Sequence, residues 1–363
     1  MKPIYPGQII GIIGAGQLGE MMALEAIAMG YIVHTYDPNP AASAHRIAQK
    51  AVIKAFDDAA SLIAFCAECA VITYEFENVD NTLLEQIQQH FNCPQGSKAL
   101  IISSHRWREL GFARQQGIPT LNSIVVHDRS DLSAASKQLG FPFVLKTCTQ
   151  GYDGHGQQRI DTPEDFIHLS VDEELLAQQW LIAIRSRDGI HLYPPFANHH
   201  KKGILAYTQV PAPLDSLLQK HLEAYTLMLI ENLDYIGCLA VEYFVQGGQI
   251  YFNEMAPRPH NSGHCTLEAS NKSQFKAHIE AVCGLAVGEL KHLRPALMVN
   301  ILGQHYQRAR DYLFTPDYQA AFFHDYLKPE IRMDRKMAHM TFCSESAWHD
   351  GMRFYERIEK NDE

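Results

Sequence analysis

A glycine-rich turn at residues 14–19 is the feature that most constrains how this chain can fold. Its sequence, "GAGQLG", follows the apolar run 8–13 and precedes a helix-like run that leads into a second apolar run at 31–38. A strand, a glycine turn, a helix and a second strand in this order make a βαβ unit. Two further strand-like runs follow with helical segments between them, so we expect residues 1–102 to form a small α/β domain with a parallel sheet.

The same turn also indicates a ligand. Gly14, Gly16 and Gly19 form a GxGxxG pattern, and Asp37 ends the next strand, close to where an acid that binds ribose belongs. Taken alone, the pattern suggests a nicotinamide enzyme, but an open helix N-terminus can hold any phosphate, including one on a substrate. A third interpretation is close helix–strand packing with no ligand. This stretch alone does not decide among the three.

A larger domain follows. Residues 103–122 read as a capped helix, and strands and helices alternate up to about residue 180. Beyond that point the pattern is typical of a sheet, with one long helix at 214–233. We expect residues 103–300 to form one α/β domain and residues 301–363 to form a smaller C-terminal domain.

Composition excludes several classes of function. Lysine and arginine total 31 against 41 aspartates and glutamates, a net charge of −10, whereas a general binder of nucleic acid or of anionic membranes needs a basic surface. No run of about 18 apolar residues is present, and the N-terminus does not read as a signal peptide. The 8 cysteines are scattered apart from one CxxC at Cys66 and Cys69, so we expect reduced thiols in a cytoplasmic enzyme and no zinc site.

Three features downstream point together to a nucleotide. Lys146 ends an apolar strand, and the loop after it has glycines at 151, 154 and 156, which let backbone N–H groups approach a phosphate. Glu242 and Glu254 lie on two strand-like runs joined by the short turn "QGGQ", so adjacent antiparallel strands would bring both carboxylates to one face. A buried carboxylate pair is costly without a cation, and hard oxygen ligands suit Mg²⁺. We therefore expect a site for magnesium and ATP.

Five stretches of the chain resemble one enzyme family. They are "GAGQLG" (14–19), "YEFENV" (74–79), "KTCTQGYDGHGQ" (146–157), "NEMAPRPHNSGHCT" (253–266) and "YLKPEIRMDRKMAHMT" (326–341). In this order they resemble the N5-carboxyaminoimidazole ribonucleotide synthetases, which are ATP-grasp enzymes of purine biosynthesis, and the likeness covers nearly the whole chain. The resemblance implies a Rossmann-like N-terminal domain, an ATP-grasp core with a mobile lid at about 123–180, and a small C-terminal domain.

The resemblance also implies a reaction. ATP would phosphorylate bicarbonate to carboxyphosphate, and carboxyphosphate, or CO₂ released from it, would carboxylate the amine of 5-aminoimidazole ribonucleotide. ADP and phosphate would leave. Mg²⁺ would be the cofactor, and the enzyme would be a homodimer in the cytoplasm.

The residues that match the family's motifs acquire implied roles. For ATP these are Arg106, Lys146, Gly151, Tyr152, Asp153, Gly154, His155, Gly156, Gln157, Gln178, Gln179, Asn253 and Glu254, and for Mg²⁺ they are Glu242 and Glu254. For the ribonucleotide they are Gln17, Leu18, Glu75, Asn261, Ser262, Arg335 and Lys336. Tyr152, Asp153, Arg258 and His260 would surround the carboxylating centre, and Asp153 would remove the amine proton. On this interpretation the glycine turn binds the 5′-phosphate region of the ribonucleotide rather than NAD.

The chain departs from the family's pattern at several positions. Ala256 stands where related enzymes often have an asparagine, so we expect only two protein ligands to the metal, and Leu327 replaces a glycine. Gln178 replaces an acid, and the chain then runs directly into "LIAIRS" without the usual short insert that carries a glutamate for the nucleotide ribose. If a loop is missing there, the intact mass would exceed that of this sequence. If the short hinge is native, ATP binding should be weaker.

Three other interpretations stay open. The chain could be a formate-dependent phosphoribosylglycinamide formyltransferase or another ATP-grasp ligase, although "APRPHNSGH" and "RKMAH" favour the carboxyaminoimidazole reaction. It could be a nicotinamide oxidoreductase, which would leave the two glutamates unexplained. It could also be a catalytically inactive relative that only binds a nucleotide. Nucleotide turnover separates the last interpretation from the enzymes.

Overall fold

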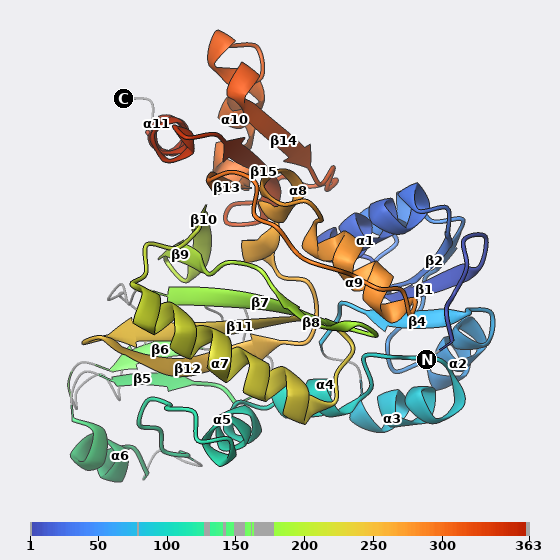
Figure 1. Ribbon diagram of the computed structural model, residues 1–363, viewed down its shortest axis with the longest axis horizontal. Helices are drawn as coiled ribbons and strands as arrows, with labels where there is room; N and C mark the ends of the chain where they lie inside the picture. Colours follow the sequence, from blue (N-terminus) through green and yellow to red (C-terminus); the bar gives the residue numbers. More distant parts are fainter. Residues whose placement is uncertain are drawn as a thin grey trace.

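The computed structural model has three parts that follow one another along the chain (Figure 1). It describes residues 2–77, 80–126, 131–140, 143–148, 157–160, 162 and 178–360. A small parallel sheet forms the N-terminal part, a large antiparallel sheet covered by helices forms the centre, and the C-terminal part extends that large sheet. Within the described residues, no helix is long and apolar enough to cross a membrane.

The N-terminal part is a four-stranded parallel sheet in the order β3-β2-β1-β4. Its elements are β1 (Ile9–Ile13), α1 (Gln17–Ala28), β2 (Ile32–Tyr36), η1 (Ser43–Arg46), β3 (Lys50–Val52), α2 (Ala59–Ala67), β4 (Val71–Tyr74) and α3 (Asn81–His90). The predicted βαβ unit, β1-α1-β2, is therefore confirmed. The strand order reverses between β1 and β4, and open α/β sheets bind ligands at such a switch point.

The central part is built on strands of a nine-stranded sheet whose path is β12-β11-β7-β9-β10-β13-β15-β14, with β8 paired to β7. The central strands are β7 (Gln178–Ser186), β8 (Gly189–Leu192), β9 (Phe196–Lys201), β10 (Ile204–Val210), β11 (Gly237–Gln246) and β12 (Gln249–Ala256). Gly247 and Gly248 connect β11 to β12 at φ of 59° and 75°. Both residues of the tightest hairpin turns need this left-handed conformation, which glycine adopts without strain.

Helices cover the faces of the central sheet. They are α4 (Lys98–Ser103), α5 (Arg106–Gln115), α7 (Ser216–Leu233), α8 (Thr266–Ala269) and α9 (Gln274–Val282), with the short η3 (Asn261–Gly263). The predicted long helix is α7, and its Leu222 and Leu229 share a buried cluster with Leu239 and Val241 of β11. Helix α9 contacts β7 and β11 on one side and α1 on the other, so it joins the N-terminal part to the centre.

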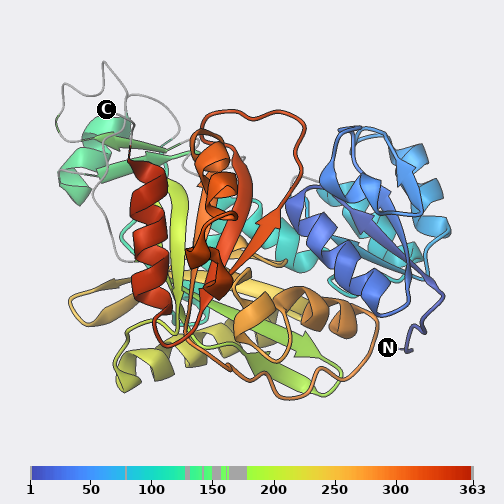
Figure 2. The same ribbon diagram turned by 90° about the horizontal axis from the view of Figure 1, so that it is seen from above.

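The C-terminal part continues the same sheet. It consists of β13 (Ala296–Leu302), η4 (Gly303–His305), α10 (Tyr306–Tyr312), η5 (Pro316–Ala320), β14 (Ala321–Asp325), β15 (Lys336–Cys343) and α11 (Ala347–Glu359). Because β13 pairs with β10 on one side and with β15 on the other, the sheet is continuous from the centre into the C-terminal part. The boundary expected after residue 300 falls within β13. Seen from above, α11 lies along this end of the sheet (Figure 2).

A separate hairpin pairs β5 (Phe143–Lys146) with β6 (Gln157–Ile160), and α6 (Asp131–Leu139) precedes it. Lys146 therefore lies at the end of β5, as expected, opposite the backbone of Gln157. Strand β7 runs without interruption from Gln178 and pairs with β11 in a continuous register. Leu327 lies in the left-handed region at φ of 48°, a conformation that glycine adopts without strain.

Candidate active site

The two glutamates predicted to hold a metal lie directly opposite each other. Glu242 of β11 pairs with Glu254 of β12 in the antiparallel register, and a bulge follows immediately after this pair. Opposed residues of neighbouring strands project from the same face. Glu242 is buried, whereas the side chain of Glu254 is 44% exposed. The prediction that both carboxylates share one face at one level is confirmed.

Arg106 connects this pair to helix α5. It is the first residue of α5, and its Nη1 lies 3.3 Å from Glu254 Oε2 and 3.3 Å from Glu109 Oε2. Asn253 accepts a hydrogen bond from Arg106 Nη2 and donates one to Glu242 Oε1. Asn253 was expected to contact ATP. The structure places its buried amide between the arginine and the metal-ligand candidate, where it orients both.

Glu109 is a residue that the motifs did not indicate. It is buried, it pairs with Arg106 one helical turn earlier, and its Oε1 accepts a 2.6 Å hydrogen bond from the backbone N–H of Met255. Burial raises the pKa of Glu109 well above its ordinary value, although the Arg106 guanidinium opposes that shift. Its i, i+3 spacing from Arg106 was the only signal available in the sequence.

The charges around Glu242 favour a bound cation. Burial, and secondarily the neighbouring carboxylate of Glu254, raise the pKa of Glu242 to about 8. Burial, and secondarily the positive charge of Arg106, lower the pKa of Lys146, while Glu254 and Glu242 oppose that shift. Lys146 is therefore close enough to both glutamates to interact with them. Together with Glu109, which also pairs with Arg106, these side chains form a polar cluster of three carboxylates and two cations, so one carboxylate lacks a positive charge to balance it.

The glycine turn is arranged differently from the expectation. The N–H of Gly16 donates to Glu75 Oε1 at 2.8 Å, and the N–H of Ala15 donates to Asp37 Oδ2 at 2.9 Å. A Cβ atom on Gly16 would lie 2.9 Å from the same Glu75 oxygen. In this structure two carboxylates of the protein take the N–H groups of Ala15 and Gly16, and the expected binding of the 5′-phosphate region at this turn stays a prediction. The glycines admit the side chain of Glu75.

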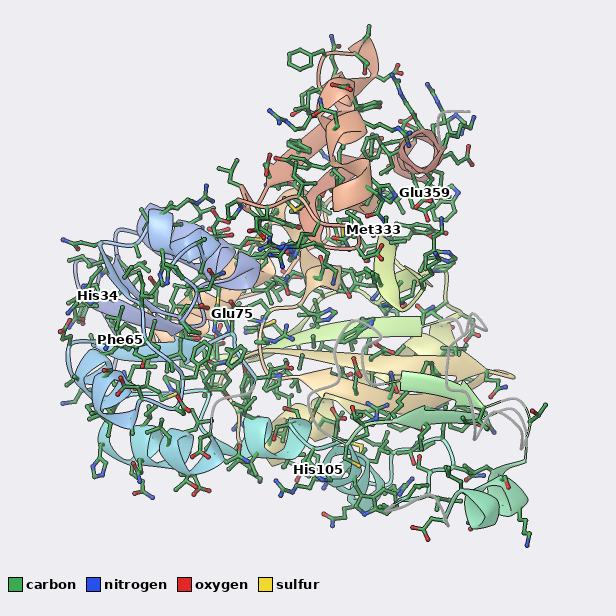
Figure 3. All side chains as sticks on the ribbon, turned by 180° about the vertical axis from the view of Figure 1, so that it is seen from behind. His34, Phe65, Glu75, His105, Met333 and Glu359 are labelled. Atoms are coloured by element: carbon green, nitrogen blue, oxygen red, sulfur yellow. The ribbon has the colours of Figure 1, made fainter. Side chains whose placement is uncertain are left out.

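Basic and polar groups gather instead where the N-terminal and C-terminal parts meet. Gln17, the first residue of α1, lies 2.6 Å from His264 Nε2 and accepts a 3.4 Å hydrogen bond from Lys328 Nζ. Lys328 also donates to the backbone carbonyl of Lys336 at 2.6 Å. These residues come from three parts of the chain. Figure 3 shows Glu75 on the side of the N-terminal part that faces the centre.

Leu18 and Arg335 are the chain neighbours of Gln17 and Lys336, but their side chains make different contacts. Leu18 is half-buried and packs against the core of the N-terminal part. The guanidinium of Arg335 donates to the carbonyl of Glu330 within its own loop, at 3.0 Å. Their predicted roles toward the ribonucleotide stay predictions.

The loop 256–264 carries four predicted site residues, Arg258, His260, Asn261 and Ser262. Arg258 Nε lies 2.9 Å from Glu77 Oε1, and the ring of His260 stacks on Trp180 with the ring centroids 3.9 Å apart. Asn261 is buried, yet neither atom of its amide has a hydrogen-bond partner among the described residues. Buried polar groups are nearly always paired, so this amide has the character of a ligand contact. Ser262 is fully buried, and its hydroxyl contacts His260 and Asn198. Its expected direct contact with substrate stays a prediction.

The remaining predicted contacts to the nucleotide are only partly visible. Gln179 is buried and its Oε1 has no hydrogen-bond partner, which fits a residue that contacts a ligand. The loop residues Gly151, Tyr152, Asp153, Gly154, His155 and Gly156 lie outside the described residues, as do the side chains of Gln157 and Gln178. The roles expected of them stay predictions.

Family models match nearly the whole length of the chain. Residues 8–104 match the ribonucleotide synthetase preATP-grasp domain, residues 111–275 match the ATP-grasp domain, and residues 296–349 match the phosphoribosylaminoimidazole carboxylase C-terminal domain. The three matches follow the order of the three structural parts.

Curated relatives and solved structures agree with these matches. The chain is 36% identical over 356 residues to the N5-carboxyaminoimidazole ribonucleotide synthase of Bacillus subtilis (strain 168), covering 94% of this chain and 93% of the relative. It is 34% identical over 368 residues to that of Staphylococcus aureus (strain MRSA252), covering 97% of each. A crystal structure of an N5-carboxyaminoimidazole ribonucleotide synthetase with ADP superimposes with a TM-score of 0.93 at 35% identity, covering 99% of this chain and 100% of that one. The Staphylococcus aureus synthetase with ADP gives a TM-score of 0.93 at 33% identity, covering 99% of each chain.

Proposed function

This chain belongs to the N5-carboxyaminoimidazole ribonucleotide synthase family of ATP-grasp ligases, and we propose how its residues perform that reaction. ATP and bicarbonate carboxylate the amine of 5-aminoimidazole ribonucleotide through carboxyphosphate, releasing ADP and phosphate in purine biosynthesis. The observation that supports this most is the cross-strand pair Glu242 and Glu254, held beside Arg106 and Lys146.

The glutamate pair fits Mg²⁺. Oxygen ligands are those that Mg²⁺ prefers, and the raised pKa of Glu242 reflects burial and a second carboxylate that a divalent cation would offset. Glu242 and Glu254 would hold the ion, and Asn253 would orient Glu242 toward it. Bound there, Mg²⁺ neutralises the charge of the nucleotide phosphates during phosphoryl transfer. Arg106 and Lys146 contribute fixed positive charge at the same place.

The ribonucleotide would bind between the N-terminal and C-terminal parts. Lys336, Lys328 and Gln17 would take its 5′-phosphate, because the N–H groups of Ala15 and Gly16 already donate to carboxylates. Glu75 would accept hydrogen bonds from hydroxyl groups of the ribonucleotide at the sheet's switch point. The unpaired amide of Asn261 would contact the same ligand.

Carboxyphosphate is a labile mixed anhydride, so the site has to exclude water while it exists. A glycine-hinged loop over residues 151–156 would close on both substrates. Arg258, held by Glu77, suits the oxygens of bicarbonate because guanidinium binds such groups with two parallel hydrogen bonds. Asp153 would take the amine proton, next to Tyr152. We further propose that the enzyme acts as a homodimer in the cytoplasm.

The test is ADP release from Mg-ATP and bicarbonate, with and without 5-aminoimidazole ribonucleotide. We expect release that depends strongly on the ribonucleotide and stops when EDTA removes the metal. Release unaffected by the ribonucleotide would assign ATP-grasp chemistry to a different acceptor, and no release under any condition would make the chain a nucleotide-binding relative.

A matched pair of variants tests the metal ligands. Glu242→Gln should lower turnover by about 100-fold or more, since it removes one charged ligand. Glu289→Gln removes an exposed carboxylate that pairs with Lys291, far from the metal-ligand candidates in sequence, and it should leave turnover unchanged. An active Glu242→Gln variant with unaltered Mg²⁺ dependence would overturn the metal assignment.

A further inference from the structure

The ring of His260 is held in one protonation pattern by the residues behind it. The backbone N–H of Ser262 points at His260 Nδ1 at 3.2 Å, and the hydroxyl of Ser262 lies 2.9 Å from the same nitrogen. A backbone N–H can only donate, so Nδ1 accepts. When one ring nitrogen accepts, the proton of a neutral imidazole lies on the other nitrogen, which here is Nε2.

Two further polar side chains continue this arrangement into the sheet. Asn198 Nδ2 donates to Ser262 Oγ at 2.6 Å, and Thr208 Oγ1 donates to Asn198 Oδ1 at 2.7 Å. Asn198 of β9 and Thr208 of β10 are direct cross-strand partners. Thr208 and Ser262 are fully buried, and Asn198 is 8% exposed. We call Thr208, Asn198 and Ser262 the relay.

The direction of the hydrogen bonds along the relay is consistent from one end to the other. The hydroxyl of Thr208 donates to the side-chain oxygen of Asn198, so the amide nitrogen of Asn198 points toward Ser262. Since Ser262 Oγ accepts from that nitrogen, its own hydrogen is free to donate to His260 Nδ1. His260 Nδ1 thus accepts from both the hydroxyl and the backbone of Ser262.

The surroundings of His260 keep the ring neutral. Trp180 covers one face of the ring at an interplanar angle of 12°. Burial, and then the positive charges of Arg258 and Lys336 together with His264 and His200, lower the pKa of His260 well below its ordinary value. A neutral ring with a hydrogen on Nε2 is a hydrogen-bond donor in a region of positive charge.

We propose that Asn198 and Thr208 are positioning residues that act through Ser262 to hold His260 as the neutral tautomer with its proton on Nε2. In that state His260 donates to an anionic oxygen at the carboxylating centre, such as an oxygen of bicarbonate or of the carbamate product. It does not accept the amine proton, which passes to another group. The inference rests on the proposed function, because it gives His260 its role in that reaction.

Nitrogen-15 NMR of protein labelled at histidine tests the tautomer directly, with the signals of His260 assigned by their loss in His260→Asn. We expect the wild-type spectrum to show a neutral ring with hydrogen on Nε2 only. Asn198→Asp has nearly the same shape as asparagine but cannot donate to Ser262, so the serine hydroxyl would turn toward the new carboxylate. Its oxygen could then accept from His260 Nδ1, against the 3.2 Å contact with the backbone N–H of Ser262, so we expect this variant to show a mixture of tautomers. In Asn198→Ala the serine hydroxyl can still donate to Nδ1, so we expect the wild-type tautomer.

Steady-state kinetics separate positioning from a structural role. Loss of a residue that orients a metal-bound histidine typically costs about 10- to 100-fold in activity, and we take the same scale for His260. We expect Asn198→Asp to lower kcat by about that factor, with KM for ATP changed by less than about 2-fold, and Asn198→Ala and Thr208→Val to have smaller effects in the same direction.

Thr341→Val is the matched control for Thr208→Val. Thr341 is a buried threonine of the same sheet whose hydroxyl has no hydrogen-bond partner within the part of the chain that the structure describes, so the identical substitution should change neither kcat nor the His260 spectrum. Circular dichroism and the melting temperature would verify that each variant is folded.

Two outcomes would overturn the proposal: a wild-type His260 that carries its proton on Nδ1, or an Asn198→Asp variant with unchanged tautomer and unchanged kcat. A wild-type protein without ribonucleotide-dependent ADP release would instead overturn the proposed function. The spectrum would still show whether the relay sets the tautomer, so the two failures are distinguishable.

Discussion

Asn253 and Glu109 show how single residues outside the obvious motifs build the nucleotide site. Asn253 forms hydrogen bonds with both Arg106 and Glu242. Glu109 forms an ion pair with Arg106 and accepts a hydrogen bond from the backbone N–H of Met255. Neither residue needs to touch the ligand to matter, because each restricts the rotamers of a side chain that does. Preorganised charge of this kind is worth more in a buried site than in water.

Glu109→Gln should weaken ATP binding while the fold persists. The glutamine oxygen can still accept from Met255, but the negative charge that holds Arg106 is lost. We expect KM for ATP to rise about 10-fold, the cost of a charge-assisted hydrogen bond, with a smaller change in KM for the ribonucleotide. Glu289→Gln is again the exposed control. An unchanged KM for ATP would show that Arg106 keeps its position without Glu109.

Leu327→Gly should stabilise the protein. Leucine at φ of 48° is strained, and glycine relieves that strain by about 1 kcal/mol. Leu293 is equally exposed, at 58%, and is not in the left-handed region, so Leu293→Gly should have no such benefit. Urea midpoints of both variants measure the difference. Equal or lower stability of Leu327→Gly would show that the leucine side chain makes a compensating contact.

Among the elements, the first βα turn illustrates how one local structure can serve different chemistry. Strand, glycine turn and helix are those of a nucleotide-binding fold, yet the carboxylates of Glu75 and Asp37 take the N–H groups that a phosphate would need. Glu75 follows β4, the neighbour of β1 in the sheet, so parallel pairing brings the two strand ends together. The turn thereby holds the side chain of Glu75 at the end of β1.

Gly16→Ala should affect the ribonucleotide specifically. Its Cβ would come within 2.9 Å of Glu75 Oε1, the movable end of a side chain, so the carboxylate should shift while the backbone stays. We expect KM for the ribonucleotide to rise several-fold and KM for ATP to stay constant. In Gly19→Ala the new Cβ would meet the backbone oxygen of Gly14 at 2.6 Å, and the whole turn should be destabilised. Equal kinetics of wild type and Gly16→Ala would argue against a role for Glu75.

In the whole molecule, the interface between the N-terminal and central parts contains polar contacts as well as apolar ones. His278 of α9 is buried, contacts Thr73 of β4 at 2.7 Å and accepts from the N–H of Cys238 of β11 at 3.0 Å. It therefore links the N-terminal sheet to the central one. Phe275 and Ile279 of the same helix pack into the core of the N-terminal part.

His278 should make stability depend on pH. Burial lowers the pKa of His278 to about 3, against about 6.5 in the unfolded chain. Its contribution is thus fully present above about pH 6.5 and is lost as the pH falls, by about 2 kcal/mol at about pH 5. We expect His278→Gln to reduce the loss of stability, measured by urea unfolding, between pH 7 and pH 5. His90→Gln, at an exposed position, should keep the wild-type loss. Identical pH profiles for wild type and His278→Gln would contradict this assignment.

Several features followed from the sequence because they depend on neighbours along the chain. The βαβ unit, helix α7 and the facing of Glu242 and Glu254 are set by the period of apolar residues and by a two-residue glycine turn. The motifs in the loop 256–264 and at residues 335–339 were specific enough to indicate the family, which the relatives then showed.

Other features were decided only by tertiary structure. Three arrangements join residues that are distant in the chain. They are the contact of Glu75 with the glycine turn, the polar cluster of Gln17, Lys328 and Lys336, and the relay behind His260. No local pattern specifies which polar side chains will meet once strands and helices pack. A buried donor must find an acceptor, and the packing of the parts against one another determines which one it finds.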